Sequence, residues 1–173
     1  MDIRLRQMTG AFLRRNKLRL VMNGQDMLLM KRAETMRIAP GLWAGIGGHV
    51  EPEEISDPVQ CVLREIEEET GIVADSITGI RLQAVVHRQR GQEIRVQYIY
   101  FGYTETRDLG YTAEGALHWI RQSAVLEKAM SAANRFVLEK YFQDGPSDDI
   151  WVGVLGNDGG RPKIQWSSLA DWE

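Results

Sequence analysis

Residues 47–72 read GGHVEPEEISDPVQCVLREIEEETGI, and they form the most informative stretch of the sequence. Its second half predicts a helix from Pro58 to Thr70 with clear ends. Asp57 suits the N-cap position and a proline follows at the first helical position. Gln60 completes a capping box with Asp57, and Gly71 is placed to end the helix in a left-handed conformation.

The predicted helix carries an apolar face and an acidic face. Successive helical residues turn by about 100°, which brings together the apolar side chains of Val59, Val62, Leu63 and Ile66. Glu65, Glu68 and Glu69 share a second face, whereas Glu67 points away from them. Like charges at these spacings repel by roughly 0.2–0.5 kcal/mol per pair. The spacing alone is compatible with a solvated acidic face or with a site for hard divalent cations.

The whole stretch resembles the Nudix box of the MutT-type pyrophosphohydrolases. The matching positions are Gly48, Glu54, Arg64, Glu65, Ile66, Glu68, Glu69, Gly71 and Ile72. One departure is an insertion, because nine residues separate Glu54 from Arg64 where the pattern has seven. We place the two extra residues within 55–58, just before the helix, where additional residues are absorbed most easily.

The resemblance implies a metal site. In the family a backbone carbonyl at the position of Gly47 is a ligand, and Glu68 and Glu69 match the main metal-binding carboxylates. Glu65 matches an acid that binds a further metal ion or serves as the base. Arg64 matches the cation that holds a box carboxylate in place. The implied cofactor is Mg²⁺, with Mn²⁺ as a substitute.

One further catalytic candidate and two substrate-binding candidates complete the expected site. Many MutT-like members carry a glutamate on a loop that faces the metals, and Glu114 stands in a similar setting. Glu114 is therefore a candidate ligand or base, with an ordinary loop acid as the alternative. Arg32, at the end of a predicted strand, and Glu54 of the box are the candidates for substrate binding.

Other segments predict the elements around the box. The expected elements are an early hairpin (18–22 and 27–30), strands at 82–87 and 96–103, an amphipathic helix over 125–142, and a closing hairpin (150–155 and 162–166). The expected fold is of the α/β (α+β) class: an α/β/α sandwich with a mixed sheet, in which the box (48–72) forms a loop–helix–loop. We expect one domain over 1–173, with the C-terminal helix and hairpin at 125–166.

Composition limits the other classes of function. The chain has 173 residues, 43% hydrophobic and 26% charged, with a net charge of −3. An acidic chain argues against a nucleic-acid polymer as partner. No uncharged stretch is long enough to cross a membrane, and the first ten residues lack the apolar core of a signal peptide. With a single cysteine, Cys61, the expected compartment is the cytoplasm.

The resemblance predicts the reaction more specifically than the substrate. It implies Mg²⁺-dependent hydrolysis of a nucleoside diphosphate linked to another group, with a small nucleotide as partner and a homodimer left open. The favoured substrate is a (d)NTP such as 8-oxo-dGTP, cleaved to the monophosphate and pyrophosphate. The alternatives are ADP-ribose, a nucleotide sugar or a dinucleoside polyphosphate. A non-catalytic nucleotide sensor on the same fold is the rival from another class.

Overall fold

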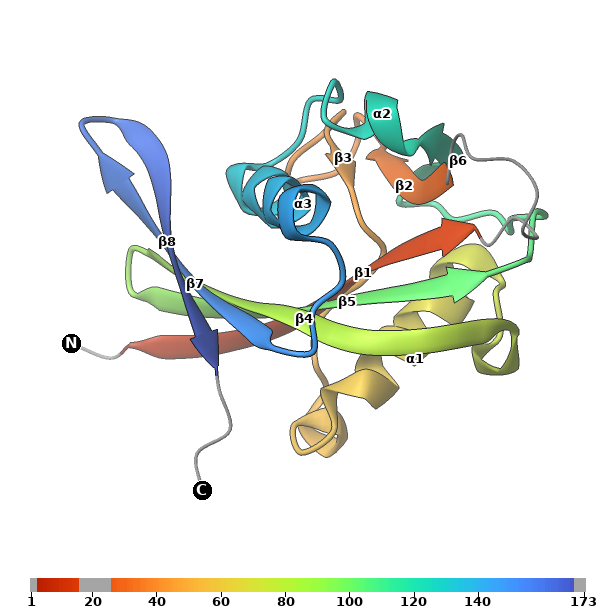
Figure 1. Cartoon of the computed structure of the whole chain (residues 1–173), viewed down its shortest axis with the longest axis horizontal. Helices are drawn as coiled ribbons and strands as arrows, with labels where there is room; N and C mark the ends of the chain where they lie inside the picture. Colours follow the sequence, from red (N-terminus) through yellow and green to blue (C-terminus); the bar gives the residue numbers. More distant parts are fainter. Residues whose placement is uncertain (1–2, 16–25, 170–173) are drawn as a thin grey trace.

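The computed structural model describes residues 3–15 and 26–169, and in these ranges eight strands form one sheet (Figure 1). The strands are β1 (Arg4–Arg15), β2 (Asp26–Arg32), β3 (Trp43–Ala44), β4 (Ile77–Arg90), β5 (Glu93–Thr104), β6 (Gly115–Arg121), β7 (Ile150–Asp158) and β8 (Arg161–Leu169). The α-helices are α1 (Pro58–Thr70), α2 (Gln122–Val125) and α3 (Ala132–Asp144), and short 3₁₀ turns occupy Pro52–Glu54 and Ala74–Ser76.

The sheet is mixed, as the sequence predicts. Its order is β3-β2-β1-β5-β4-β7-β8, and β6 pairs with β2 outside this path. The pairs β1–β5 and β4–β7 are parallel, whereas the remaining neighbours run antiparallel. The long hairpin β4–β5 therefore lies in the middle of the sheet, and β7–β8 extends it at one edge.

Helices cover both faces of the sheet, which confirms the sandwich. Val62 and Ile66 of α1 pack in one buried cluster with Leu13 and Leu28. A second cluster joins α3 to the other face, where the Tyr141 ring stacks on the Phe101 ring with centroids 3.6 Å apart. Figure 1 shows α1 and α3 on opposite sides of the central strands. Apolar burial therefore holds α1 against one face of the sheet and α3 against the other.

The predicted continuous helix over 125–142 is wrong. Helix α2 ends at Val125 and α3 begins only at Ala132. The backbone between them bonds to the sheet instead, because Trp43 N donates to Ala129 O at 2.8 Å and Met130 forms a bridge with Trp43. Ser131 then caps α3, its Oγ accepting from the Asn134 N–H at 3.3 Å.

The predicted cap of α1 is correct in position and wrong in detail. Asp57 does precede the helix, but its side chain accepts no hydrogen bond from the helix backbone, and Gln60 Nε2 donates to the Asp57 carboxylate instead. A capping-box contact occurs instead at the preceding 3₁₀ turn, where Glu51 N donates to Glu54 Oε2 at 3.0 Å. At the other end Gly71 is left-handed as predicted, with φ +75°.

The other predicted strands are confirmed. The segments 82–87 and 96–103 lie in β4 and β5, 27–30 lies in β2, and 150–155 and 162–166 lie in β7 and β8. The first half of the expected early hairpin, 18–22, lies outside the described residues. Strand β1 was not predicted. Across the described part of the chain, no helix combines the length and apolar character that a membrane crossing needs.

Candidate functional site

The loop that contains Gly47 and Gly48, here called the glycine loop, passes close to strand β1 and to helix α1. Thr9 N donates to Gly48 O at 2.9 Å, so the loop lies against the backbone of β1. Gly47 has φ +150°, and a side chain at Gly48 would collide with the Glu65 carboxylate. Both positions therefore require glycine, because the backbone and an acid of α1 share the same space.

Helix α1 delivers its three acids to different environments. Glu69 is 8% exposed, and its Oε2 accepts a hydrogen bond from Gly47 N at 3.3 Å. The Glu65 side chain is largely buried beside Gly48. The Glu68 side chain is 59% exposed and contacts Arg64. The acidic face predicted from the helical spacing is therefore divided, with Glu65 and Glu69 on the inner side.

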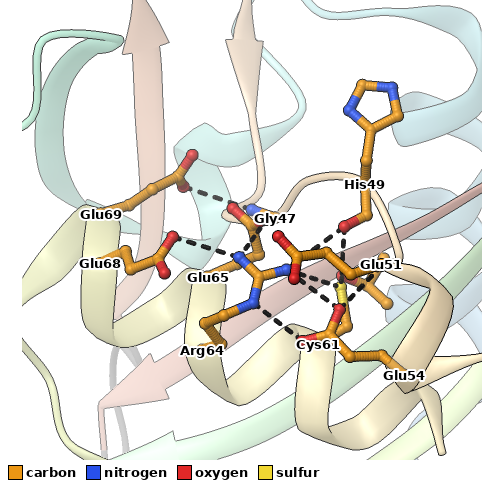
Figure 2. A network of polar contacts seen from close by, with 10 residues as sticks. Gly47, His49, Glu51, Glu54, Cys61, Arg64, Glu65, Glu68 and Glu69 are labelled. Atoms are coloured by element: carbon orange, nitrogen blue, oxygen red, sulfur yellow. Dashed lines mark hydrogen bonds and ion pairs between the residues drawn. The ribbon is translucent and has the colours of Figure 1, made fainter.

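Arg64 is the centre of the polar network (Figure 2). Its Nε and Nη2 bind the two oxygens of Glu54 at 2.8 and 3.1 Å. Its Nη1 reaches Glu65 Oε1 at 2.9 Å and Glu68 Oε2 at 3.2 Å, and Nη2 donates to His49 O at 3.3 Å. One guanidinium thus ties the glycine loop, the 3₁₀ turn and α1 together.

These contacts shift the pKa values of both partners of the bidentate pair. The hydrogen bonds from Arg64 lower the pKa of Glu54 to about 2. The same contacts, together with those to Glu65, raise the pKa of Arg64 well above its usual range. Both groups are therefore charged at neutral pH.

The inner acids experience the opposite effect. Burial raises the pKa of Glu65, and burial followed by the charges of Glu114 and Glu65 raises the pKa of Glu69 to about 8. The hydrogen bond from Gly47 N and the charge of Arg32 oppose this shift in the pKa of Glu69. Three carboxylates from α1 and the loop before β6 thus repel one another at the inner side of the site.

The donor chemistry of this inner group fits a hard cation, although the side chains do not enclose one. Within residues 3–15 and 26–169, no three Asp, Glu, His or Cys side chains are gathered closely enough to surround a metal ion. Arg64 holds Glu65 and Glu68 in ion pairs. Carboxylate and carbonyl oxygens at a site with uncompensated negative charge are nevertheless the ligands that Mg²⁺ prefers.

A cleft of about 500 Å³ opens beside this group. Four of the predicted site residues line it, namely Arg32, Gly47, Glu65 and Glu114. The other four, Glu54, Arg64, Glu68 and Glu69, are not among its lining residues. Glu54 in particular faces Arg64, so the structure does not place it where a substrate in the cleft would touch it.

Arg32 and Glu114 meet at one wall of the cleft. Arg32 is the last residue of β2, and Glu114 directly precedes β6. The two strands pair antiparallel with Arg32 opposite Gly115, which brings Arg32 and Glu114 together. Arg32 Nη1 lies 3.5 Å from Glu114 Oε2, and Arg32 Nε donates to Ile38 O at 3.1 Å. The predicted base candidate and the predicted phosphate contact are therefore neighbours.

Several residues of the cleft were not identified from the sequence. Arg6 of β1 and Arg95 of β5 line it, as do Gln97, Ser131 and Asn134. Arg95 lies between Ile94 and Val96, and this alternation is the one sequence signal that sets its side chain apart from its apolar neighbours. The face that Arg6 shares with Arg95 follows only from the pairing of β1 with β5. Cys61, by contrast, is fully buried, and burial raises the pKa of its thiol to about 11.

Comparisons with known proteins identify the family and agree with the fold. A family model described as the NUDIX domain matches residues 12–141. The bovine (Bos taurus) m7GpppN-mRNA hydrolase NUDT17 is 46% identical over 48 residues, which are 28% of this chain and 15% of that protein. The matched stretch thus spans a small part of that relative.

Solved structures share the fold at low sequence identity. The mutator MutT protein of Bacillus halodurans superimposes with a TM-score of 0.70 and 18% identity, covering 93% of this chain and 97% of its own. The NUDIX domain of Shewanella oneidensis NrtR, solved with ADP-ribose, gives a TM-score of 0.65 and 18% identity over 83% of this chain and 89% of its own.

Proposed function

Because the chain belongs to the Nudix family, whose domain matches residues 12–141, we propose that it is a Mg²⁺-dependent hydrolase of acid anhydrides. Its substrate is a nucleoside diphosphate linked to another group. The observation that carries this proposal is the shared cleft, in which the acids Glu65 and Glu114 and the cation Arg32 face the same space of about 500 Å³. Such a space accommodates a nucleotide-sized ligand.

The Gly47 carbonyl and the carboxylates of Glu65, Glu68 and Glu69 would hold Mg²⁺ in this site. A bound ion would supply neutralisation of the diphosphate and a lower pKa for a water molecule. The chain supplies the remaining functions. Arg64 orients Glu65 through the 2.9 Å contact, Glu65 or Glu114 accepts the proton of the attacking water, and Arg32 binds a phosphate oxygen.

Within this class we propose a (d)NTP such as 8-oxo-dGTP as the substrate, cleaved to the monophosphate and pyrophosphate. The structural likeness to a MutT protein supports this choice. ADP-ribose, nucleotide sugars and dinucleoside polyphosphates are the alternatives, and ADP-ribose is the ligand of the NrtR domain. A small nucleotide is the proposed partner.

A substrate panel with product identification tests the proposal. The purified chain is incubated with Mg²⁺ and each nucleotide class, and the products are separated by ion-exchange chromatography. Hydrolysis in ¹⁸O-water identifies the phosphorus that is attacked. Release of a nucleoside monophosphate from any member supports the function. Nucleotide binding without hydrolysis of any member would favour the sensor instead.

Mg²⁺ should stabilise the folded protein. Because the inner acids repel one another, a bound cation adds free energy of folding by mass action. At a concentration about a hundredfold above Kd, the melting temperature should rise by about 5–10 °C. Differential scanning fluorimetry measures the shift, with NaCl of equal ionic strength as control. Equal melting temperatures in the two salts would contradict a metal site.

Deleting Ile55 and Ser56, which restores the common spacing of the box, should leave kcat/KM within about tenfold of the parent. Both residues are exposed and lie between the 3₁₀ turn and α1, so their loss leaves the spacing within the helix unchanged. Two loop residues change the closure free energy by well under ~1 kcal/mol. Circular dichroism verifies folding. A folded deletion variant without activity would show that this bulge places Glu54 on Arg64.

A further inference from the structure

Three arginines lie side by side across the sheet at the end of the cleft formed by β1, β5 and β4. Arg6 is the parallel partner of Arg95, and Arg95 is the antiparallel partner of Arg88. Residues directly opposite in neighbouring strands project from the same face. All three line the cleft that also contains Glu65 and Glu114. We name Arg6, Arg88 and Arg95 the arginine row.

The arginine row carries more positive charge than its surroundings compensate. The adjoining row on the same face is Arg4, Glu93 and Arg90, so the two rows hold five arginines and one glutamate. Glu93 is engaged by Arg95 and lies 3.2 Å from Arg6 Nε. Like charges directly opposite each other destabilise a sheet. An anion in front of the row would remove this repulsion.

Arg88 is the member of the row with unused binding capacity. In the described part of the chain it forms no ion pair, and its Nε is buried without a hydrogen-bond partner. Burial and the charges of Arg95 and Arg90 lower its pKa. Arg95, which lies opposite Arg88, is 8% exposed and is therefore a buried side chain and not a surface one. A buried donor without a partner at a cleft wall is available to a polar ligand in the cleft, and Arg88 is the residue with such an Nε atom that lines it.

The arginine row contacts the glycine loop through His49. Arg6 Nη1 lies 3.1 Å from His49 Nε2, while the backbone oxygen of His49 accepts from Arg64. Figure 2 shows the His49 ring directed away from the Arg64 network, with its backbone oxygen directed toward it. One ligand can thus face the carboxylates with one part and the arginine row with another.

We propose that the arginine row binds a phosphate additional to the diphosphate that is cleaved, so that the preferred substrate is a nucleotide bearing this further phosphate. The inference rests on the proposed function for the cleaved bond only. Guanidinium groups bind phosphate through paired N–H donors, and three of them in one row along the wall of the cleft suit a dianion. The extra phosphate can belong to a ribose 2′- or 3′-position or to a longer polyphosphate chain, since the chemistry recognised is the same.

Binding of uncleavable nucleotides tests this subsite independently of hydrolysis. Calorimetry in Mg²⁺ compares AMP with adenosine 2′,5′-bisphosphate and with adenosine 3′,5′-bisphosphate. It also compares α,β-methylene-ADP with the ATP analogue in which both bridging oxygens are replaced by methylene. None of these contains a P–O–P anhydride. The native chain should bind at least one ligand that carries the additional phosphate about tenfold or more tightly than its reference, AMP or α,β-methylene-ADP. The ligand that gains affinity identifies whether the phosphate belongs to the ribose or to the chain.

Matched substitutions assign the gain to the arginine row. Arg88→Gln should abolish the preference, and Arg88→Lys should retain part of it because the charge remains. Arg90→Gln is the control, because Arg90 lies on the same strand and the same face but outside the cleft lining. Removing Arg88 relieves its repulsion with Arg95, so melting temperatures should not fall.

The outcomes separate this inference from the proposed function. Equal affinities with and without the additional phosphate in both comparisons, or a preference for it that survives Arg88→Gln, would overturn the phosphate subsite even if anhydrides are hydrolysed. A preference lost in Arg88→Gln and kept in Arg90→Gln supports the subsite even if no member of the substrate panel is cleaved.

Discussion

Glu69→Gln should lower kcat/KM by on the order of 100-fold or more while raising the melting temperature of the metal-free protein. Glu69 is buried, and its pKa is raised to about 8 by burial and by the charges of Glu114 and Glu65. The amide keeps the volume of the side chain and an oxygen that can accept from Gly47 N. The amide cannot ionise, so it removes the cost of keeping this acid buried above its unfolded pKa, and it also removes the carboxylate that a cation would bind.

Glu67→Gln is the matched control, because Glu67 is exposed on the same helix and points away from the site. Its kcat/KM should stay within about twofold of the parent, as expected for a surface substitution. Steady-state assays at limiting Mg²⁺ and thermal melts with and without Mg²⁺ compare the two variants. The Mg²⁺-induced shift should disappear in Glu69→Gln alone.

Glu68→Gln should also lose most of its activity, for a different structural reason. Its carboxylate is exposed and held by Arg64 at 3.2 Å, so it is available to a cation but contributes little to folding. We therefore expect no gain in melting temperature for this variant. If either Glu68→Gln or Glu69→Gln keeps the parent turnover at limiting Mg²⁺, its assignment as a metal ligand is wrong.

Helix α1 shows what a sequence can predict. Its position, its apolar face and its left-handed end at Gly71 were all predicted, because each depends on residues within one or two turns. The burial of Glu69 against the exposure of Glu68 was not predicted. The two are adjacent in sequence, and which one faces inward is decided by how α1 packs on β1 and the glycine loop.

The elements that the sequence did not reveal depend on distant partners. Strand β1 is stabilised by parallel pairing with β5, about ninety positions later, as in Arg6 with Arg95. A single sequence does not show such pairing, so the arginine row could not be assembled from it. The prediction of one continuous helix over 125–142 was wrong for a similar reason. The backbone oxygen of Ala129 accepts a hydrogen bond from Trp43 N and not from the next helical turn.

Arg64→Met should lower kcat/KM by about 10–100-fold and destabilise the fold at neutral pH. The guanidinium binds Glu54 through two hydrogen bonds and Glu65 through one. Removing it leaves Glu54, whose side chain is largely buried, without its partner. Arg64→Lys should recover only part of the activity, because an ammonium cannot reproduce the forked contact with Glu54.

Arg81→Met is the control for the loss of an arginine. Arg81 pairs with Asp148 at 2.7 Å, but both side chains are exposed, so this ion pair contributes about 0–1 kcal/mol. The melting temperature and the activity of Arg81→Met should remain close to those of the parent. A comparable loss in the two variants would show that any missing arginine destabilises the chain, and the special role of Arg64 would then be rejected.

The acid stability of the Arg64 variants gives a further and more specific measurement. The pKa of Glu54 is lowered to about 2 by Arg64, from an ordinary value of 4.5 in the unfolded chain. A carboxyl group with a lowered pKa stabilises the fold fully above its unfolded value and loses this contribution as the pH falls toward its folded value. The difference in melting temperature between the parent and Arg64→Met should therefore shrink between pH 5 and pH 2. A difference that stays constant over this range would mean that the Glu54–Arg64 pair does not stabilise the site.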